Sequence, residues 1–201
     1  MQVSLVDYSW AAGVVTELVN TAPGVWSGVD KLADPAALSR FLDDHTVVPD
    51  RPRGDPSPAD VTAVHQLRDR LRALIDDPEP NRLIRGATDL TATGSGGLTL
   101  AADHAGRTYW HALADPAGSL AERLALVCGV GVLGVVHTLG AERFRPCSAP
   151  TCSGVFIDTS RPGRRRYCMP DLCGNRINVA NHRARQNRPP ATPGPDSGPD
   201  V

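Results

Sequence analysis

Two stretches near the C-terminus decide how this chain is organised: CSAPTCSG at residues 147–154 and CMPDLCGNR at residues 168–176. Each holds two cysteines separated by four residues, and 15 residues separate the second cysteine from the third. Each pair can close a tight turn, and the link lets the two turns face each other across one ion. Four thiolates so arranged are typical of a structural zinc site with no open position. We therefore predict Zn²⁺ as the cofactor, with four metal ligands: Cys147, Cys152, Cys168 and Cys173.

Two disulfides are the alternative use of these cysteines. The N-terminal residues MQVSLVDYSWAAGVV lack the basic start of a secretory signal, and the longest apolar run, Leu124 to Val136, is too short to span a membrane. We expect a cytoplasmic protein with no membrane partner, where paired cysteines bind metal more often than they form disulfides. An iron–sulfur cluster gains no support from these spacings. The fifth cysteine, Cys128, lies in the apolar segment LALVCGVGV and is expected to be buried.

The metal is expected to fold its own module. Between the cysteine pairs stand only GVFID and a basic loop, which are too short to build a hydrophobic core. Structural zinc can contribute about 10–16 kcal/mol of apparent binding free energy, enough to replace such a core. Small residues follow each second cysteine, Ser153-Gly154 and Gly174-Asn175, and they allow backbone N–H groups to turn toward the sulfurs.

Charge is divided unevenly along the 201 residues. Residues 1–140 carry 17 acidic and 11 basic side chains, whereas residues 141–188 carry 10 arginines and 3 acids. The whole chain has a net charge of −1, so its average charge indicates no partner. The concentration of arginine in the cysteine-rich part is typical of an interaction module.

The arginines stand around the cysteines. SRPGRRRYC places four of them on the loop that returns to Cys168, and an extended return would put Arg164 and Arg166 on one face. GNRINVANHRARQNR after Cys173 is expected to form a terminal helix with Asn175 as its N-cap. Guanidinium groups bind phosphate oxygens in bidentate fashion, and Arg and Asn side chains read base edges. The predicted DNA-contacting residues are Arg161, Arg164, Arg165, Arg166, Asn175, Arg176, His182, Arg183 and Arg185.

The first 140 residues are expected to be mainly helical. Apolar spacing predicts helices over residues 3–20, 35–45, 59–77, 81–90 and 116–140, with Asp34 as one N-cap and Ser57 or Asp60 as another. LTLAADHAGRTYWHAL at residues 98–113 has the pattern of a β-hairpin. We predict a mainly α fold in three parts. They are an acidic helix-rich regulatory domain with a small hairpin (1–140), a four-cysteine zinc-knuckle or ribbon module with a terminal helix (141–188), and a disordered Pro-rich tail (189–201).

The C-terminal motifs together resemble a known family. CGNR at residues 173–176, the F-I-D-T-S-R segment and R-R-R-Y-C are similar to the CGNR zinc finger. ELVNT at residues 17–21, the helix from Leu32 to Leu42 and the hairpin ending in Tyr109-Trp110 resemble the ABATE domain of stress-induced transcription regulators. The resemblance implies a bacterial DNA-binding regulator, with the four cysteines as zinc ligands and Asn175 and Arg176 as signature residues of the finger.

Two functions follow from these features. In the first, the finger binds DNA, as a homodimer because one small module makes few phosphate contacts, and the N-terminal domain dimerises or senses a signal. Such a protein would be associated with the nucleoid. In the second, the protein is an adaptor whose basic module binds an acidic protein. RNA binding has little support because few aromatic residues stand near the finger.

We do not expect an enzyme. No phosphate-binding loop, nucleophile elbow or HExxH motif occurs, and Asp103, His104 and His111 beside the hairpin have the composition of an ordinary surface. A small-molecule pocket in residues 1–140 is a weaker expectation, with Asn20, Thr21 and Trp110 as its lining.

Overall fold

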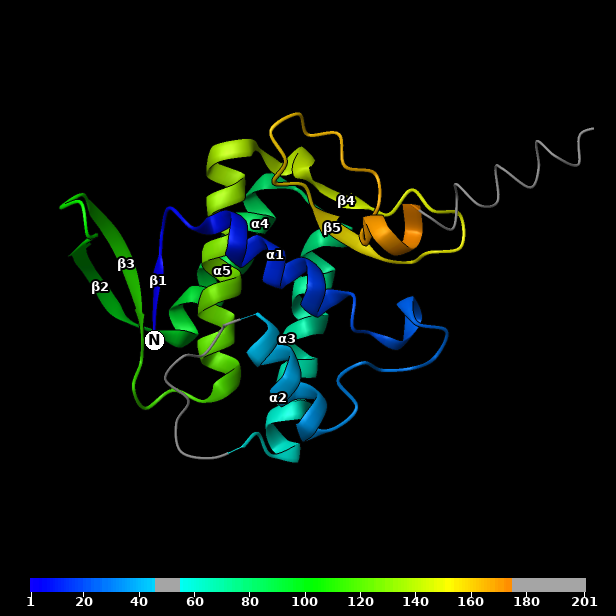
Figure 1. Cartoon of the computed structure of the whole chain (residues 1–201), viewed down its shortest axis with the longest axis horizontal. Helices are drawn as coiled ribbons and strands as arrows, with labels where there is room; N and C mark the ends of the chain where they lie inside the picture. Colours follow the sequence, from blue (N-terminus) through cyan, green and yellow to red (C-terminus); the bar gives the residue numbers. More distant parts are fainter. Residues whose placement is uncertain (46–54, 175–201) are drawn as a thin grey trace, which may run out of the picture.

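In the computed structural model, which describes residues 1–45 and 55–174, α-helices form most of the N-terminal part and a small hairpin module follows (Figure 1). The predicted mainly α fold is confirmed. The elements are β1 (Gln2–Ser4), α1 (Tyr8–Val19), η1 (Pro23–Val25), α2 (Pro35–Asp44), α3 (Pro58–Asp76), α4 (Pro80–Gly94), β2 (Ser95–Ala102), β3 (Thr108–Ala114), α5 (Leu120–Leu139), η2 (Ala141–Arg143), β4 (Phe144–Pro146), β5 (Val155–Ile157) and η3 (Pro170–Gly174).

Helix starts follow the capping residues in the sequence. The Asp34 carboxylate accepts a hydrogen bond from the Ala37 N–H at the start of α2. Of the two alternatives predicted for the start of α3, Ser57 is the N-cap, and Asp60 forms a reciprocal capping box with it. Helix α4 is longer than the expected short helix, because Glu79 caps it and it continues to Gly94.

Helix α5 is the centre of the core, between α1 and α4 (Figure 1). Its glycines permit this close packing. A Cβ on Gly129 would lie 2.6 Å from Thr91 on α4, and one on Gly131 would lie 2.7 Å from the Ala11 backbone on α1. Helix α5 is long and apolar enough to span a membrane, but most of it is buried inside the protein, as in the core helix of a soluble fold.

A three-stranded antiparallel sheet has the order β1-β3-β2. The β2–β3 hairpin was predicted. The expected helix from residue 3 was wrong at its start, because residues 2–4 form β1 and the helix begins at Tyr8. Val3 lies opposite Ala112 and is buried, so pairing with a strand more than 100 residues away overrides the local apolar spacing.

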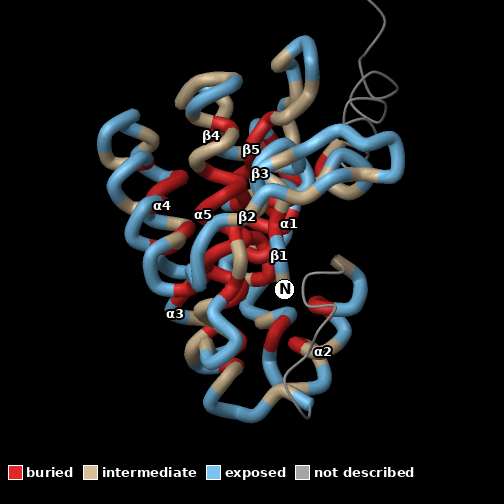
Figure 2. The backbone as a smooth tube through the Cα atoms, turned by 90° about the vertical axis from the view of Figure 1, so that its left-hand side faces the viewer, coloured by how far each residue is buried: buried red, intermediate tan, exposed pale blue. Residues whose placement is uncertain are grey.

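The C-terminal hairpin of β4 and β5 packs on the helices. Phe144, Val155 and Ile157 are buried in the same apolar cluster as α1, α3 and α5. Figure 2 shows the buried residues gathered in the middle of the molecule, where these elements meet. The predicted terminal helix and the tail at residues 189–201 lie outside the described residues, as do Asn175, Arg176, His182, Arg183 and Arg185.

Candidate zinc centre and arginine loop

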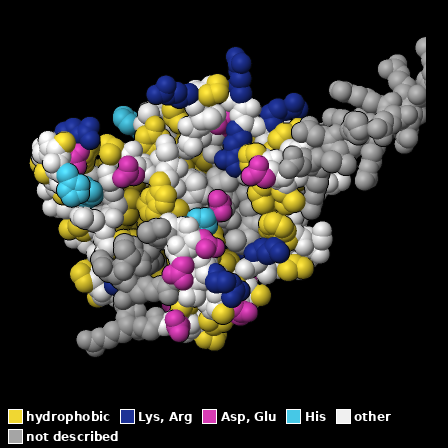
Figure 3. Space-filling view, viewed as in Figure 1, with side chains coloured by type: hydrophobic (Ala, Val, Ile, Leu, Met, Phe, Trp, Pro, Cys, Tyr) yellow, Lys and Arg dark blue, Asp and Glu magenta, His cyan; other side chains and the backbone are white. Residues whose placement is uncertain are grey.

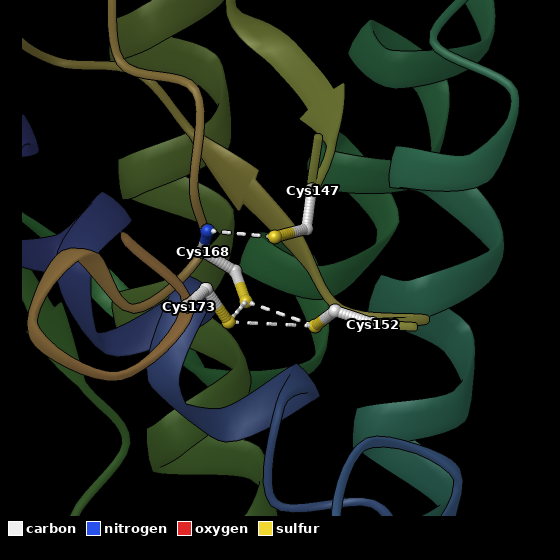
Figure 4. A group of neighbouring side chains, drawn as sticks. All are labelled: Cys147, Cys152, Cys168 and Cys173. Atoms are coloured by element: carbon white, nitrogen blue, oxygen red, sulfur yellow. Dashed lines mark hydrogen bonds between the residues drawn. The ribbon is translucent and has the colours of Figure 1, made fainter. Parts of the chain in front are cut away.

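The four cysteines converge on one point (Figure 4). Cys147 and Cys152 bracket the turn that joins β4 to β5, and Cys168 and Cys173 come from the returning loop and η3. Their sulfur atoms all lie within 4.8 Å of one another. The Cys152, Cys168 and Cys173 sulfurs are separated by 3.6, 3.7 and 3.8 Å.

These distances fit a zinc ion. Zinc–sulfur bonds of about 2.3 Å in a tetrahedron place the sulfurs about 3.8 Å apart. All four cysteines are free thiols, and burial raises the pKa of the Cys173 thiol to about 11. Burial also raises the pKa of Cys168 above its ordinary value. A bound dication would hold these thiols as thiolates, and the distances between the sulfur atoms support the predicted Zn²⁺.

Backbone N–H groups point at the sulfurs. The Gly154 N–H donates to the Cys152 Sγ at 3.3 Å, as expected from the small residues after the second cysteine. The Cys168 N–H donates to the Cys147 Sγ at 3.5 Å (Figure 4). Gly154 has no room for a side chain, because a Cβ there would lie 2.5 Å from the Cys168 Sγ. These donors spread negative charge away from the thiolates.

Asp158 organises the loop that carries the arginines. Its carboxylate is fully buried and accepts hydrogen bonds from the backbone and hydroxyl of Ser160, from the Arg165 N–H and from Arg145. Burial acts to raise the pKa of Asp158, but these hydrogen bonds and the charge of Arg145 together hold it below its usual range. Nothing in the local sequence distinguishes this aspartate from a surface one, so sequence reasoning missed it.

Arg143 and Arg145, just before and within β4, also hold the backbone of this loop. Arg143 donates to the carbonyl oxygens of Asp158 and Ser160, and Arg145 donates to that of Gly163 at 2.8 Å. Gly163 has a φ of +58°, in the left-handed region, and a Cβ there would lie 2.6 Å from the Arg143 guanidinium. The loop therefore has a fixed shape that depends on a glycine and on buried polar contacts.

The loop arginines divide into two groups. Arg161, Arg164 and Arg166 are exposed, whereas Arg165 is half-buried. The Arg165 guanidinium donates to the carbonyl oxygens of Tyr167 and Cys168 and lies 5.0 Å from the centre of the Phe156 ring. Figure 3 shows several Lys and Arg side chains along the upper edge, where this loop lies in Figure 1, whereas acidic and basic side chains are mixed lower on the same face. We call Arg161, Arg164 and Arg166 the exposed arginine set.

Helix α1 is joined to the zinc module by two polar side chains on its buried face. The Thr16 hydroxyl accepts a hydrogen bond from the Ile157 N–H at 3.0 Å. The Asn20 amide donates to the Val155 carbonyl oxygen at 2.6 Å and accepts from the Val155 N–H at 3.0 Å. Thr16 lies on α1 and Asn20, four residues later, is its C-cap, so both side chains face one edge of β5. Their position on an otherwise apolar helix face was the available signal.

Asn20 and Thr21 also line a hollow of about 400 Å³ between α1, α2 and the zinc module, together with Trp26 and Arg165. Asn20 and Thr21 were predicted from the sequence to line a small-molecule pocket. Trp110, named with them, lies elsewhere, exposed on β3. The Thr21 hydroxyl is engaged, because it donates to Leu18 and accepts from Arg68.

Asp103, at the tip of the β2–β3 hairpin, stabilises the turn. Asp103 accepts hydrogen bonds from the Ala105 and Arg107 N–H groups and pairs with the Arg107 guanidinium at 2.9 Å.

Cys128 is fully buried, and burial raises the pKa of its thiol, as expected for an unreactive core side chain.

Comparison with known proteins agrees with the resemblance seen in the sequence. Residues 13–129 match the family model named ABATE, described as "Putative stress-induced transcription regulator". Residues 143–186 match the model of the CGNR zinc finger. No curated protein matches the chain.

Proposed function

The chain belongs to the ABATE family and carries a CGNR zinc finger, and from this premise we propose that it is a transcription regulator that binds DNA through the finger. A zinc-containing regulator is what the two matches and the cysteine cluster support directly. Neither match is to an enzyme family. DNA as the partner is our proposal, as are a cytoplasmic location at the nucleoid and the assignment of residues 1–140, 141–188 and 189–201 to regulatory domain, finger and tail.

The observation that carries the proposal is the exposed arginine set on a loop of fixed shape. Asp158, Arg143 and Arg145 hold the backbone of the loop, so the exposed side chains project from a constant position. A guanidinium fits the phosphate group in bidentate fashion, and little conformational entropy is lost when its backbone is already ordered. The finger is therefore suited to the sugar–phosphate backbone of a duplex.

Arg165 has a different role in this proposal. Its guanidinium already donates to two carbonyl oxygens beside Cys168 and stacks on Phe156. We assign it to holding the loop against the zinc knuckle. Among the described arginines of residues 161–166, DNA contact then rests on the exposed arginine set.

The test is binding of the zinc-loaded full chain to a labelled mixed-sequence duplex at two salt concentrations. Wild type is compared with Arg161, Arg164 and Arg166→Ala. The matched control is Arg40, Arg70 and Arg85→Ala, which removes the same charge from exposed positions of the helices. Fluorescence anisotropy gives the affinity of each variant.

Each phosphate contact lowers the binding constant about 0.9 log units for each tenfold rise in salt concentration, because counterions are released on binding. If the three guanidiniums contact phosphates, wild-type binding should therefore weaken about 40-fold between 50 and 200 mM salt from these contacts alone. The loop variant loses this dependence and the control keeps it. Absence of binding at 50 mM salt, with one zinc per chain measured, rejects the DNA proposal. If the control variant loses as much DNA affinity as the loop variant, the assignment of DNA binding to the finger is rejected. An acidic protein partner is then the explanation left for the basic surface.

A further inference from the structure

Strand β2 has an open edge. It pairs with β3 along one side, and no strand in residues 1–45 and 55–174 pairs with its other side. The Leu5 N–H donates to the Trp110 carbonyl oxygen at 2.9 Å, so the even-numbered residues of β3 bond to β1. Because bonding directions alternate along an antiparallel strand, the odd-numbered residues of β3 bond to β2. The residues of β2 whose backbone groups face the open edge are then Leu98, Leu100 and Ala102.

This edge lacks charged side chains and proline, which are two of the features that normally prevent strands from pairing. Its sequence, SGGLTLAA, contains no charged residue and no proline over 8 residues. One face is also apolar and exposed: Leu98 is 64% exposed, Leu100 is 53% exposed, and Trp110, opposite Leu100 on β3, is 57% exposed. At the hairpin tip, the charges of Asp103 and Arg107 neutralise each other in an ion pair.

The apolar face continues into a groove. A hollow of about 490 Å³ lies between the sheet and helices α4 and α5, and Leu5, Leu98, Leu126 and Leu133 contribute to its lining. Figure 1 shows β2 outermost at the left of the molecule, on the side away from β4, β5 and the zinc module. A partner bound at β2 would therefore leave the finger free.

We propose that a second copy of this chain pairs with β2, antiparallel about a two-fold axis, to make one continuous six-stranded sheet. An antiparallel edge is self-complementary in its hydrogen bonds, as a two-fold interface requires. The uncharged apolar face also meets its copy without like-charge repulsion. The inference rests on the proposed function in one respect, since a small finger needs a second finger to bind DNA tightly.

The geometry also fixes the register. A bulge between Ser95 and Gly97 ends the regular edge, so the usable segment is residues 98–102, centred on Leu100. Leu100 then faces its own copy across the axis. The hairpin tip of one molecule lies beside residues 96–97 of the other, which are glycines and offer no side chain to block it.

The test is the mass of the zinc-loaded full chain by light scattering, without DNA. Wild type should have twice the chain mass of 21.3 kDa. Leu100→Lys places two charged side chains at positions whose Cα atoms lie about 5.5 Å apart across the axis, and their repulsion should give the single-chain mass. The matched control is Ile84→Lys on α4, 43% exposed in the structure, which should remain a dimer.

A wild type that stays monomeric at high concentration overturns the proposal, and a small apolar ligand or another protein then occupies the groove. A Leu100→Lys variant that remains a dimer overturns it too. If that variant does not fold by circular dichroism, Leu100→Cys replaces it. Two cysteines whose Cα atoms lie about 5.5 Å apart across the axis are within reach of a disulfide and should form one on oxidation, and Ile84→Cys should not. Lack of that crosslink rejects the interface. Because no DNA is present, a failure here is separate from a failure of DNA binding.

Discussion

Asn20 and Val155, 135 residues apart in the chain, are joined through both backbone polar groups of Val155. The Asn20 amide takes the place that a neighbouring strand would occupy at the edge of β5. Thr16 continues the contact one helical turn earlier, at Ile157. Helix α1 of the ABATE part thus completes the hydrogen bonding of the zinc module, so the two parts share a polar contact as well as an apolar core.

Replacing Asn20 should destabilise the whole chain. Asn20→Leu leaves the Val155 N–H and carbonyl buried without partners, at about 1–3 kcal/mol for each group. We expect the free energy of unfolding in urea to fall by about 2–4 kcal/mol, while exposed Asn81→Leu changes it by less than about 0.5 kcal/mol. Equal, small effects of the two substitutions would mean that the contact contributes nothing to stability.

Removing zinc should weaken the N-terminal part as well as the finger. All three tryptophans stand within the first 110 residues, so their fluorescence reports on the N-terminal part. Val155 and Ile157 belong to its core, and their strand loses its support when the cysteines lose the metal. A strong chelator should therefore move the fluorescence-detected urea midpoint to lower concentration. A midpoint that does not move would show that the two parts fold independently.

Asp158 should position the arginine loop for DNA. Asp158→Asn raises the net charge by one, which by itself favours DNA binding, but it weakens the hydrogen bonds that hold the loop. We expect it to lower DNA affinity several-fold, whereas Asp69→Asn, the same charge change on exposed α3, should not lower it. Zinc content is measured for both variants as a control. If both variants bind DNA more tightly than wild type, Asp158 does not position the loop.

Asp30 and Arg68 should give stability that depends on pH. The Asp30 carboxylate accepts two hydrogen bonds of 2.8 Å from the buried Arg68 guanidinium. Burial acts to raise the pKa of Asp30, but these bonds and the charge of Arg68 hold it below its usual range. A lowered pKa in the folded state means that the stabilisation is complete above about pH 4, the usual value for an aspartate, and is lost as pH falls through the folded value.

Asp30→Asn therefore should cost about 3 kcal/mol at pH 7, and its difference from wild type should narrow below about pH 4. Acid weakens zinc binding in both proteins, so the difference between them isolates Asp30. Urea unfolding from pH 3 to pH 7 measures it. If the difference in unfolding free energy between the two proteins stays constant over this pH range, the ionised Asp30 carboxylate is not its cause.

Local features of the sequence determined the cysteine cluster, the helix starts at Asp34 and Ser57, and the β2–β3 hairpin. Each depends on residues within a few positions of one another, or on ligand spacing that a metal imposes. That Arg164 and Arg166 share a face stays a prediction, although both side chains are exposed and Arg165 between them is half-buried.

Only the tertiary structure decided the remaining contacts. β1 forms because Val3 meets Ala112, and Asn20 is buried because it meets Val155. Asp158 is buried because Arg143 and Arg145, from the strand region before it, enclose its loop. Each depends on two segments that are separated by more than ten residues and lie side by side in the folded protein. The sequence pattern of one segment does not show which distant polar group will pack against it, because that pairing depends on the free energy of the whole core.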